Sequence, residues 1–219
     1  RPLSDVDLAA GIREANRVRR LLAALRRLAY TTEPCPMPAL EMLIAEMLVI
    51  HFCSHQAECL VVLDELVREA QRRVQRDEGT SPPDAARVFW LNPVADLRVM
   101  NMLEDAGGRI CGTEYLFSHS LDLIPEHLEP LSALARTALA DPMVGSPNDR
   151  AARVCRDIQA FHAEALVVSR IPGASHCSME GLTIGETVRR RLGVPVLEME
   201  VPSVSESMEP TLRTRLEAL

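Results

Sequence analysis

"RVFWLNPVADLRVMNMLEDAGGRICGTEYL", residues 87–116, is the stretch that decides the fold of this chain. It opens with a short apolar run rich in residues that favour β-structure, which predicts a strand over about 87–91. A helical pattern over about 95–106 ends at a pair of glycines, and a second apolar run predicts a strand over about 109–115. A strand, a helix and another strand in this order are typical of a parallel sheet.

Two more strands are expected downstream, over about 164–169 and 195–200. The helix before the first of them begins with Ser146 as its cap, and another helix is predicted over about 181–192. Short strands separated by helices predict a small open α/β domain of the nucleotide-fold type over 81–219, with a parallel four-stranded sheet flanked by helices. The first strand is not followed by a glycine-rich phosphate-binding turn, so a dinucleotide site is not expected.

Residues 1–80 are predicted to form a helical hairpin and linker that lead into this domain. Ser4 and Asp7 form a capping-box pattern, and apolar residues follow at spacings of three and four. The segment "TTEPCPMP" ends the first helix, because its prolines cannot continue the helical hydrogen bonds. A second helical stretch is predicted over about 39–76, either continuous or broken near "FCSH".

The charge composition excludes several kinds of chemistry. All 24 basic residues are arginines, so this chain supplies no Schiff-base lysine, lysine base or phosphate-loop lysine. A net charge of -7 argues against nucleic-acid binding, and the run Arg189–Arg191 ends a predicted helix, where positive charge is favourable. The longest apolar stretch, 42–50, is too short to span a membrane. We expect a cytoplasmic protein, and because the chain begins with Arg1, a piece of a longer polypeptide.

Cysteines are scattered along the chain, which favours reduced thiols over a disulfide framework. They are Cys35, Cys53, Cys59, Cys111, Cys155 and Cys177. One candidate metal site combines His51, His55 and Cys59, which would share one face if their helix were continuous. Histidines one turn apart also occur by chance on packed helices, so metal binding at this position is an alternative hypothesis.

The carboxyl ends of the predicted strands supply a second group of candidates, because ligands of open parallel sheets bind beyond these ends. The candidates are, in chain order, Asn92, Glu114, Ser169, Arg170, His176 and Cys177. All are expected along one edge of the sheet. From spacing alone, purely structural roles are equally open. Asn92 would then cap a turn and Glu114 would be a solvated carboxylate, while His176 would be a surface residue and Cys177 an incidental thiol.

The order of these segments resembles the C-terminal half of a subunit of the 2-hydroxyacyl-CoA dehydratase and benzoyl-CoA reductase family, with subunits such as the 2-hydroxyglutaryl-CoA dehydratase D-component. The quoted stretch is followed by "EPLSALARTAL", "SPNDRAARVCRDI", the pair "LVVS" and "HC", then "GVPVLEMEV" and "LRTRLEAL". The resemblance covers nearly the whole chain and depends on this ordered set. The ending "LRTRLEAL" is its most telling piece.

The resemblance implies a cofactor. In that family two nucleotide-fold-like domains hold a [4Fe-4S] cluster between them on cysteine thiolates, and Cys177 matches the ligand from the C-terminal domain. The other ligands would lie on an N-terminal α/β domain or on another chain. Near the cluster or the substrate, the candidates are Ser169, Arg170, Ser175, His176, Asn92 and Glu114. The approach "RIPGAS" before His176 is longer than the serine-rich segment expected in the family.

The resemblance also implies a reaction and partners. Family dehydratases remove water from (R)-2-hydroxyacyl-CoA by adding one electron to the thioester carbonyl, whereas the reductases reduce an aromatic thioester ring. The expected partners are a homologous second subunit, an ATP-dependent iron-sulfur activator and the acyl-CoA substrate, and the isolated fragment is expected to be inactive. Two alternatives stay open: a cluster-free scaffold or assembly subunit, and a small metal-binding module that uses His51, His55 and Cys59.

Overall fold

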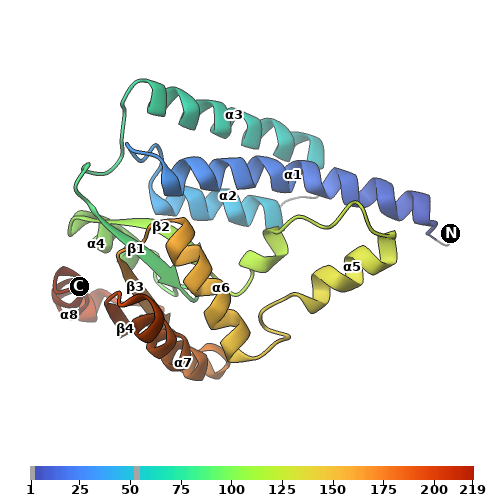
Figure 1. Cartoon of the computed structure of the whole chain (residues 1–219). Helices are drawn as coiled ribbons and strands as arrows, with labels where there is room; N and C mark the ends of the chain where they lie inside the picture. The colour runs from blue at the N-terminus through green and yellow to red at the C-terminus, as the bar shows by residue number, and fades with distance from the viewer. Residues whose placement is uncertain (1–2, 52–54) are drawn as a thin grey trace.

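The computed structural model describes residues 3–51 and 55–219, with the side chains of His51 and of residues 175–179 outside the description. Helices and strands alternate after an all-helical start (Figure 1). The helices are α1 (Asp5–Thr31), α2 (Ala39–His51), α3 (Gln56–Gln75), α4 (Arg98–Asp105), α5 (Pro130–Leu139), α6 (Pro147–Ala160), α7 (Ser175–Leu192) and α8 (Glu209–Glu217), with short 3-10 turns η1 (Ser118–Leu121) and η2 (Glu206–Met208). The strands are β1 (Ala86–Leu91), β2 (Gly108–Glu114), β3 (Ala165–Arg170) and β4 (Val196–Glu200).

The strands form one open sheet in the order β2-β1-β3-β4, and every neighbouring pair is parallel. In the centre of the sheet, Trp90 lies opposite Thr113 on one side and Val167 on the other. The register between β1 and β2 shifts between Val88 and Phe89. A side chain on Gly112 there would come within 2.7 Å of the Phe89 ring, so this position needs glycine. The predicted α/β fold with a parallel four-stranded sheet is confirmed.

Alternating strand residues face two different helical layers, as expected for a sheet that is buried on both faces. Trp90 and Val167 point to the face covered by α4 and α8. Phe89, Leu166 and Val168 point to the face covered by α6 and α7. Figure 1 shows these helices flanking the sheet. Because both faces are covered, ligands have access to the sheet mainly at the ends of its strands.

The first three helices pack into a layer of their own beside the sheet (Figure 1). The capping box predicted at Ser4 is present, with its hydroxyl accepting from the Asp7 amide at 3.2 Å. In the second helical stretch α2 ends at His51 and α3 begins at Gln56, while residues 52–54, where a break was considered, lie outside the described residues. Buried leucines and methionines from all three helices form the core of this layer: Leu22, Leu25, Met42 and Leu63.

Helix α1 covers β2, which is an edge strand of the sheet. The Tyr30 hydroxyl lies 3.1 Å from the Thr113 hydroxyl, and Arg109 donates to the Ala29 carbonyl at 2.9 Å. Covering an edge strand prevents its unpaired backbone groups from pairing with another chain. These contacts join the helical layer to the sheet. The division into a helical segment over 1–80 and an α/β domain over 81–219 therefore stays a prediction. Among the described residues, no helix is both long and apolar enough to cross a membrane.

Candidate functional site

The sheet contains a topological switch point between β1 and β3. The chain leaves β1 towards β2 on one side, whereas β3 and β4 lie on the other side. Loops that leave two neighbouring strands in opposite directions open a crevice at their carboxyl ends, where open α/β sheets bind ligands. Here those ends are Leu91 in β1 and Arg170 in β3.

Asn92 ties the ends of three strands together. Its backbone has a φ of 73°, a left-handed conformation that asparagine tolerates better than most residues. Its amide donates to the Glu114 carbonyl at 2.8 Å, and its side-chain Nδ2 donates to the Ser169 carbonyl at 3.1 Å. The side chain is fully buried, so Asn92 acts as more than a cap for a local turn.

Ser169 joins β3 to β1 in the same place. Its hydroxyl accepts from the indole Nε1 of Trp90 at 3.0 Å. The hydroxyl proton has three carbonyl oxygens within reach, of which the Pro93 oxygen is nearest at 2.9 Å. Ser169 is buried, and these contacts satisfy its polar atom. It therefore fixes the start of the loop that follows β1.

Arg150 is the centre of this edge, and sequence reasoning missed it. The guanidinium is fully buried and donates to Glu114 Oε2 at 2.6 Å, Asn92 Oδ1 at 2.7 Å and Glu180 Oε2 at 2.9 Å. We call Arg150, Asn92, Glu114 and Glu180 the Arg150 cluster. One signal was available: Arg150 stands four residues before Val154, on the buried face of the predicted helix. A cation at an apolar position of this kind indicates a buried partner.

The electrostatics of the Arg150 cluster keep the arginine charged. Burial alone would lower the pKa of Arg150, but the hydrogen bonds and charges of Glu114 and Glu180 raise it overall. Glu114 is buried, which excludes the solvated carboxylate considered from sequence. The cluster brings Asn92 and Glu114 together as expected, next to Ser169. Their polar groups bond to each other and to Arg150, so within this chain they brace the edge.

Helix α7 begins at Ser175, earlier than the predicted start at 181. A turn closed by the Ala174 amide and the Ile171 carbonyl at 3.0 Å, with Gly173 at a φ of 82°, reverses the chain directly after β3. The sequence prediction placed the start at Gly181, but this glycine lies inside the helix. A Cβ there would approach Val168 to 2.8 Å, so glycine lets α7 lie close to the sheet.

The backbone of Cys177 therefore lies in the first turn of α7, at the carboxyl end of β3. Backbone amides at a helix N-terminus stabilise a thiolate. The side chains of Ser175, His176 and Cys177 lie outside the described residues. Arg170 is half-buried, and its guanidinium lies 3.6 Å from Glu200.

The four cysteines whose side chains are described are core residues. Cys35, Cys59, Cys111 and Cys155 are all buried. Burial raises the pKa of the Cys111 thiol to about 11 and also raises the pKa of Cys155, so both stay protonated near neutral pH. A protonated thiol is a poor metal ligand. Cys53 lies outside the described residues.

The alternative metal site does not have the geometry that the sequence hypothesis required. His51 ends α2, whereas His55 is the N-cap of α3, so the helix that would align them is interrupted. Cys59 is buried in the core of the helical layer, and His55 is exposed. Across the described side chains, no group of three or more His, Cys, Asp or Glu residues is arranged to hold a metal ion.

The geometry defines a class: an open parallel α/β protein whose candidate site lies at the switch point between β1 and β3. The family model for the D-component of 2-hydroxyglutaryl-CoA dehydratase matches residues 1–219. The chain therefore belongs to this dehydratase family, as its resemblance predicted. No curated protein matches the chain.

Proposed function

We propose that this chain is part of an iron-sulfur subunit of a (R)-2-hydroxyacyl-CoA dehydratase, and that Cys177 supplies one cluster ligand. The family match over residues 1–219 supports the dehydratase assignment. The position of Cys177 carries the site assignment, because the first turn of α7 begins directly beyond the switch point. A thiolate there would face the region where ligands of open sheets bind.

The donor set of this chain fits a cluster only in part. The four described cysteines are buried, and of the two others, Cys53 and Cys177, it is Cys177 whose backbone lies at the sheet edge. Iron-sulfur clusters need several thiolates, so the other ligands would come from an N-terminal α/β domain or from another chain. When bound, the cluster would supply low-potential electrons for reduction of the thioester carbonyl. On this proposal the isolated chain is inactive.

The residues of this chain would hold the site in place and orient the substrate. The Arg150 cluster joins α6 to the ends of β1 and β2, and through Glu180 it also joins α7. Glu180 lies three residues after Cys177, so this ion pair fixes the turn that carries the thiolate. Ser175 and His176 are proposed to contact the sulfur or the bound thioester, as neighbours of a metal ligand often do.

Among the strand-end candidates whose side chains are described, Arg170 is the most exposed, whereas Asn92, Glu114 and Ser169 are buried. We propose a substrate-side role for Arg170 and a positioning role for the buried three. The partners would be a homologous second subunit, an ATP-dependent iron-sulfur activator and an acyl-CoA. This chain has no lysine and therefore no phosphate-loop lysine for ATP hydrolysis, which is consistent with ATP being hydrolysed by a separate activator.

A cluster-free scaffold or assembly subunit is the second candidate function. It is favoured by one observation: the described side chains include no group of three metal-ligating residues. The two candidate functions predict different colours and iron contents for the purified complex. A complex with a [4Fe-4S] cluster absorbs visible light, whereas a cluster-free scaffold does not.

The test uses the purified complex with its activator, ATP and a reductant. The proposal expects conversion of (R)-2-hydroxyacyl-CoA into the enoyl-CoA. The reaction is monitored through the ultraviolet absorbance of the conjugated thioester product. Reduction of an aromatic thioester ring without any dehydration would instead assign the reductase reaction. A colourless complex that acts on neither kind of thioester would favour the scaffold.

A further inference from the structure

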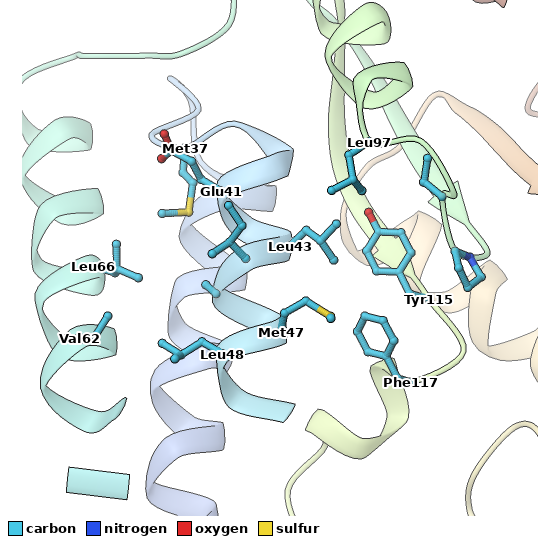
Figure 2. Close-up of a pocket in the computed structure, with 14 residues that line it drawn as sticks. Met37, Glu41, Leu43, Met47, Leu48, Val62, Leu66, Leu97, Tyr115 and Phe117 are labelled. Atoms are coloured by element: carbon cyan, nitrogen blue, oxygen red, sulfur yellow. The ribbon is translucent and has the colours of Figure 1, made fainter. Parts of the chain in front are cut away.

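An apolar groove runs over α2 (Figure 2). Its walls are α3 on one side and the loops after β1 and β2 on the other. Figure 2 shows Val62 and Leu66 on the α3 side, and Tyr115 and Phe117 on the opposite side. The groove is open to solvent, and several of its apolar side chains are exposed, namely Ile44, Val62 and Leu97. Clustered apolar side chains at a surface mark an interaction site.

The sequence of α2 indicates that both of its faces are meant to be covered. Three of its 13 residues have polar side chains, and one of these, Glu46, is itself buried. The inner face, with Met42 and Ala45, lies in the core of the helical layer. On the outer face, Ile44 is 61% exposed. A helix that is apolar all round is normally buried on all sides. The outer face of α2 is therefore suited to contact with a further element.

The first three helices form an incomplete bundle. Helix α1 packs against both α2 and α3, whereas α2 and α3 contact each other only lightly. Leu48 from α2 and Leu66 from α3 line the groove between them. A helix laid along this groove would complete a four-helix bundle, in which apolar stripes face a shared core. Because α2 has 13 residues, it extends over about 20 Å, enough to support a helix of three to four turns.

The rim of the groove is acidic. Glu41 lines the groove and is exposed. Glu58 stands four residues before Val62, and Glu65 stands three residues after it, so both lie on the groove side of α3. None of these three carboxylates forms an ion pair with another described residue. No described residue that lines the groove is cationic. Positive charge beside an apolar stripe would therefore complement this rim.

We propose that the groove binds an amphipathic helix of a partner protein, and that the apolar stripe of this helix is flanked by lysines or arginines. A second copy of this chain does not fit, because a symmetric contact through the groove would bring the two acidic rims together. An anionic membrane surface is repelled by the same charges. The proposal concerns assembly and does not depend on the cluster or on the thioester substrate.

The first test measures the binding of two synthetic peptides to the full chain by fluorescence anisotropy. Both peptides have roughly 14 residues, close to the length of α2, with leucines at spacings of three and four. One peptide carries lysine and the other glutamate at every polar position. We expect the leucine–lysine peptide to bind at least about tenfold more tightly. Its affinity should fall as salt is added, because exposed charges are screened.

The apolar contribution is tested with Ile44→Gln combined with Val62→Gln. Both side chains are exposed, so the fold does not depend on them. This double variant should bind the leucine–lysine peptide about tenfold more weakly, since it removes apolar contacts from α2 and α3. The matched control is Leu139→Gln combined with Val144→Gln, which replaces exposed apolar side chains outside the groove and should leave binding unchanged.

The acidic rim is tested with Glu58→Gln combined with Glu65→Gln. We expect this double variant to bind the leucine–lysine peptide about threefold more weakly and the leucine–glutamate peptide more tightly. The matched control is Glu186→Gln combined with Glu217→Gln, which changes the net charge equally at exposed positions of α7 and α8. Equal effects of the two double variants would overturn the role of the rim, because only the net charge would then matter.

The second test identifies what occupies the groove in the intact complex. A benzophenone side chain at position 44 is activated by light, and the peptide that it captures is sequenced by mass spectrometry. The proposal expects a segment of a partner chain with apolar residues at helical spacing and a net positive charge. Capture of a second copy of this chain, or no capture in the assembled complex, would overturn it.

The peptide measurements can also overturn the proposal. Equal affinities of the two peptides would exclude recognition by charge, and binding that Ile44→Gln with Val62→Gln leaves unchanged would place the peptide outside the groove. The iron content is measured on the same complex. A partner helix captured in a complex without iron would support the docking proposal and contradict the proposed function, whereas an iron-loaded complex without capture would do the reverse.

Discussion

Two arginines that pair with buried carboxylates in this protein have different surroundings. Arg150, at the carboxyl edge of the sheet, bonds to two carboxylates and an amide oxygen. Arg26 in α1 is partly buried and pairs with the fully buried Glu46 at 3.2 Å, but among the described residues Arg26 Nε and Glu46 Oε2 have no hydrogen-bond partner. A buried charge without its full set of partners is costly, so the second pair is the weaker one.

The contrast shows where this fold is rigid. The Arg150 cluster connects β1, β2, α6 and α7, which together carry the candidate site. The Arg26–Glu46 pair connects α1 to α2, and Arg26 also donates to the carbonyl of Thr113 at 3.3 Å, directly before Glu114 in β2. Burial raises the pKa of Glu46, and the Arg26 charge only partly offsets this effect. A saturated cluster that joins the strand ends, with the less saturated pair between the neighbouring helices, agrees with a site that needs fixed geometry.

The largest effect is expected from Arg150→Met. This change leaves Glu114 buried without its cation, and breaking a buried pair in this way costs about 3–5 kcal/mol. The measurement is the free energy of unfolding from urea denaturation of the complex or of the isolated chain, whichever unfolds reversibly. Arg156→Met is the control, because Arg156 is exposed on the same helix and should change stability by less than about 0.5 kcal/mol. Equal losses from both variants would contradict the role of the cluster.

A smaller loss is expected from Gly181→Ala. The new methyl group would lie 2.8 Å from Val168, a fully buried β-branched residue that cannot move freely. Overpacking of this kind costs about 1–3 kcal/mol, more than the helix propensity gained by alanine. Gly11→Ala on α1 meets nothing within 4 Å and should stabilise the protein by up to about 1 kcal/mol.

The clash at residue 181 can be relieved from the other side. Val168→Ala removes the methyl group that the new side chain would meet, so the double variant should lose less stability than the sum of the two single variants. Strict additivity would mean that α7 does not lie as close to β3 as the structure describes.

The smallest effect is expected from Glu46→Gln, within about 1 kcal/mol, because the carboxylate already lacks one partner. The pKa of Glu46 in the folded protein is raised above its ordinary value of 4.5 by burial. Between 4.5 and the raised pKa the unfolded chain loses this proton and the folded chain keeps it. The wild type should therefore lose stability relative to Glu46→Gln as pH rises through this window. A difference that is independent of pH would show that Glu46 is ionised throughout.

Much of the fold could be predicted from the sequence, because each strand is a short apolar run between helical segments. Predicted and observed strand ends agree within one residue, as for 87–91 against Ala86–Leu91. The edge residues Asn92 and Glu114 could also be placed, since all parallel strands end at the same side. Arg150 was missed because its partners lie 30 or more residues away and only the fold brings them together.

The start of α7 was predicted too late for a similar reason. Glycine is common at helix boundaries, which is why the local pattern predicts the start of the helix at Gly181. Glycine is required there because α7 lies close to Val168, and a local sequence pattern does not reveal that contact. The apolar groove lined by α2, α3 and the loops after β1 and β2 was also not predicted, because these segments lie far apart in the sequence. The spacing of apolar residues along the chain predicts individual helices and strands. A functional site instead depends on which distant helices and strands the fold brings into contact.

The central claim is tested most directly by the iron content of the intact complex carrying Cys177→Ala. Cys155→Ala is the matched control, because this thiol is buried in the core between α6 and the sheet. We predict that Cys177→Ala loses most of the bound iron and the visible absorption of the cluster, while Cys155→Ala keeps both. Unchanged iron and absorption in the assembled Cys177→Ala complex would contradict the assignment of Cys177 as a cluster ligand.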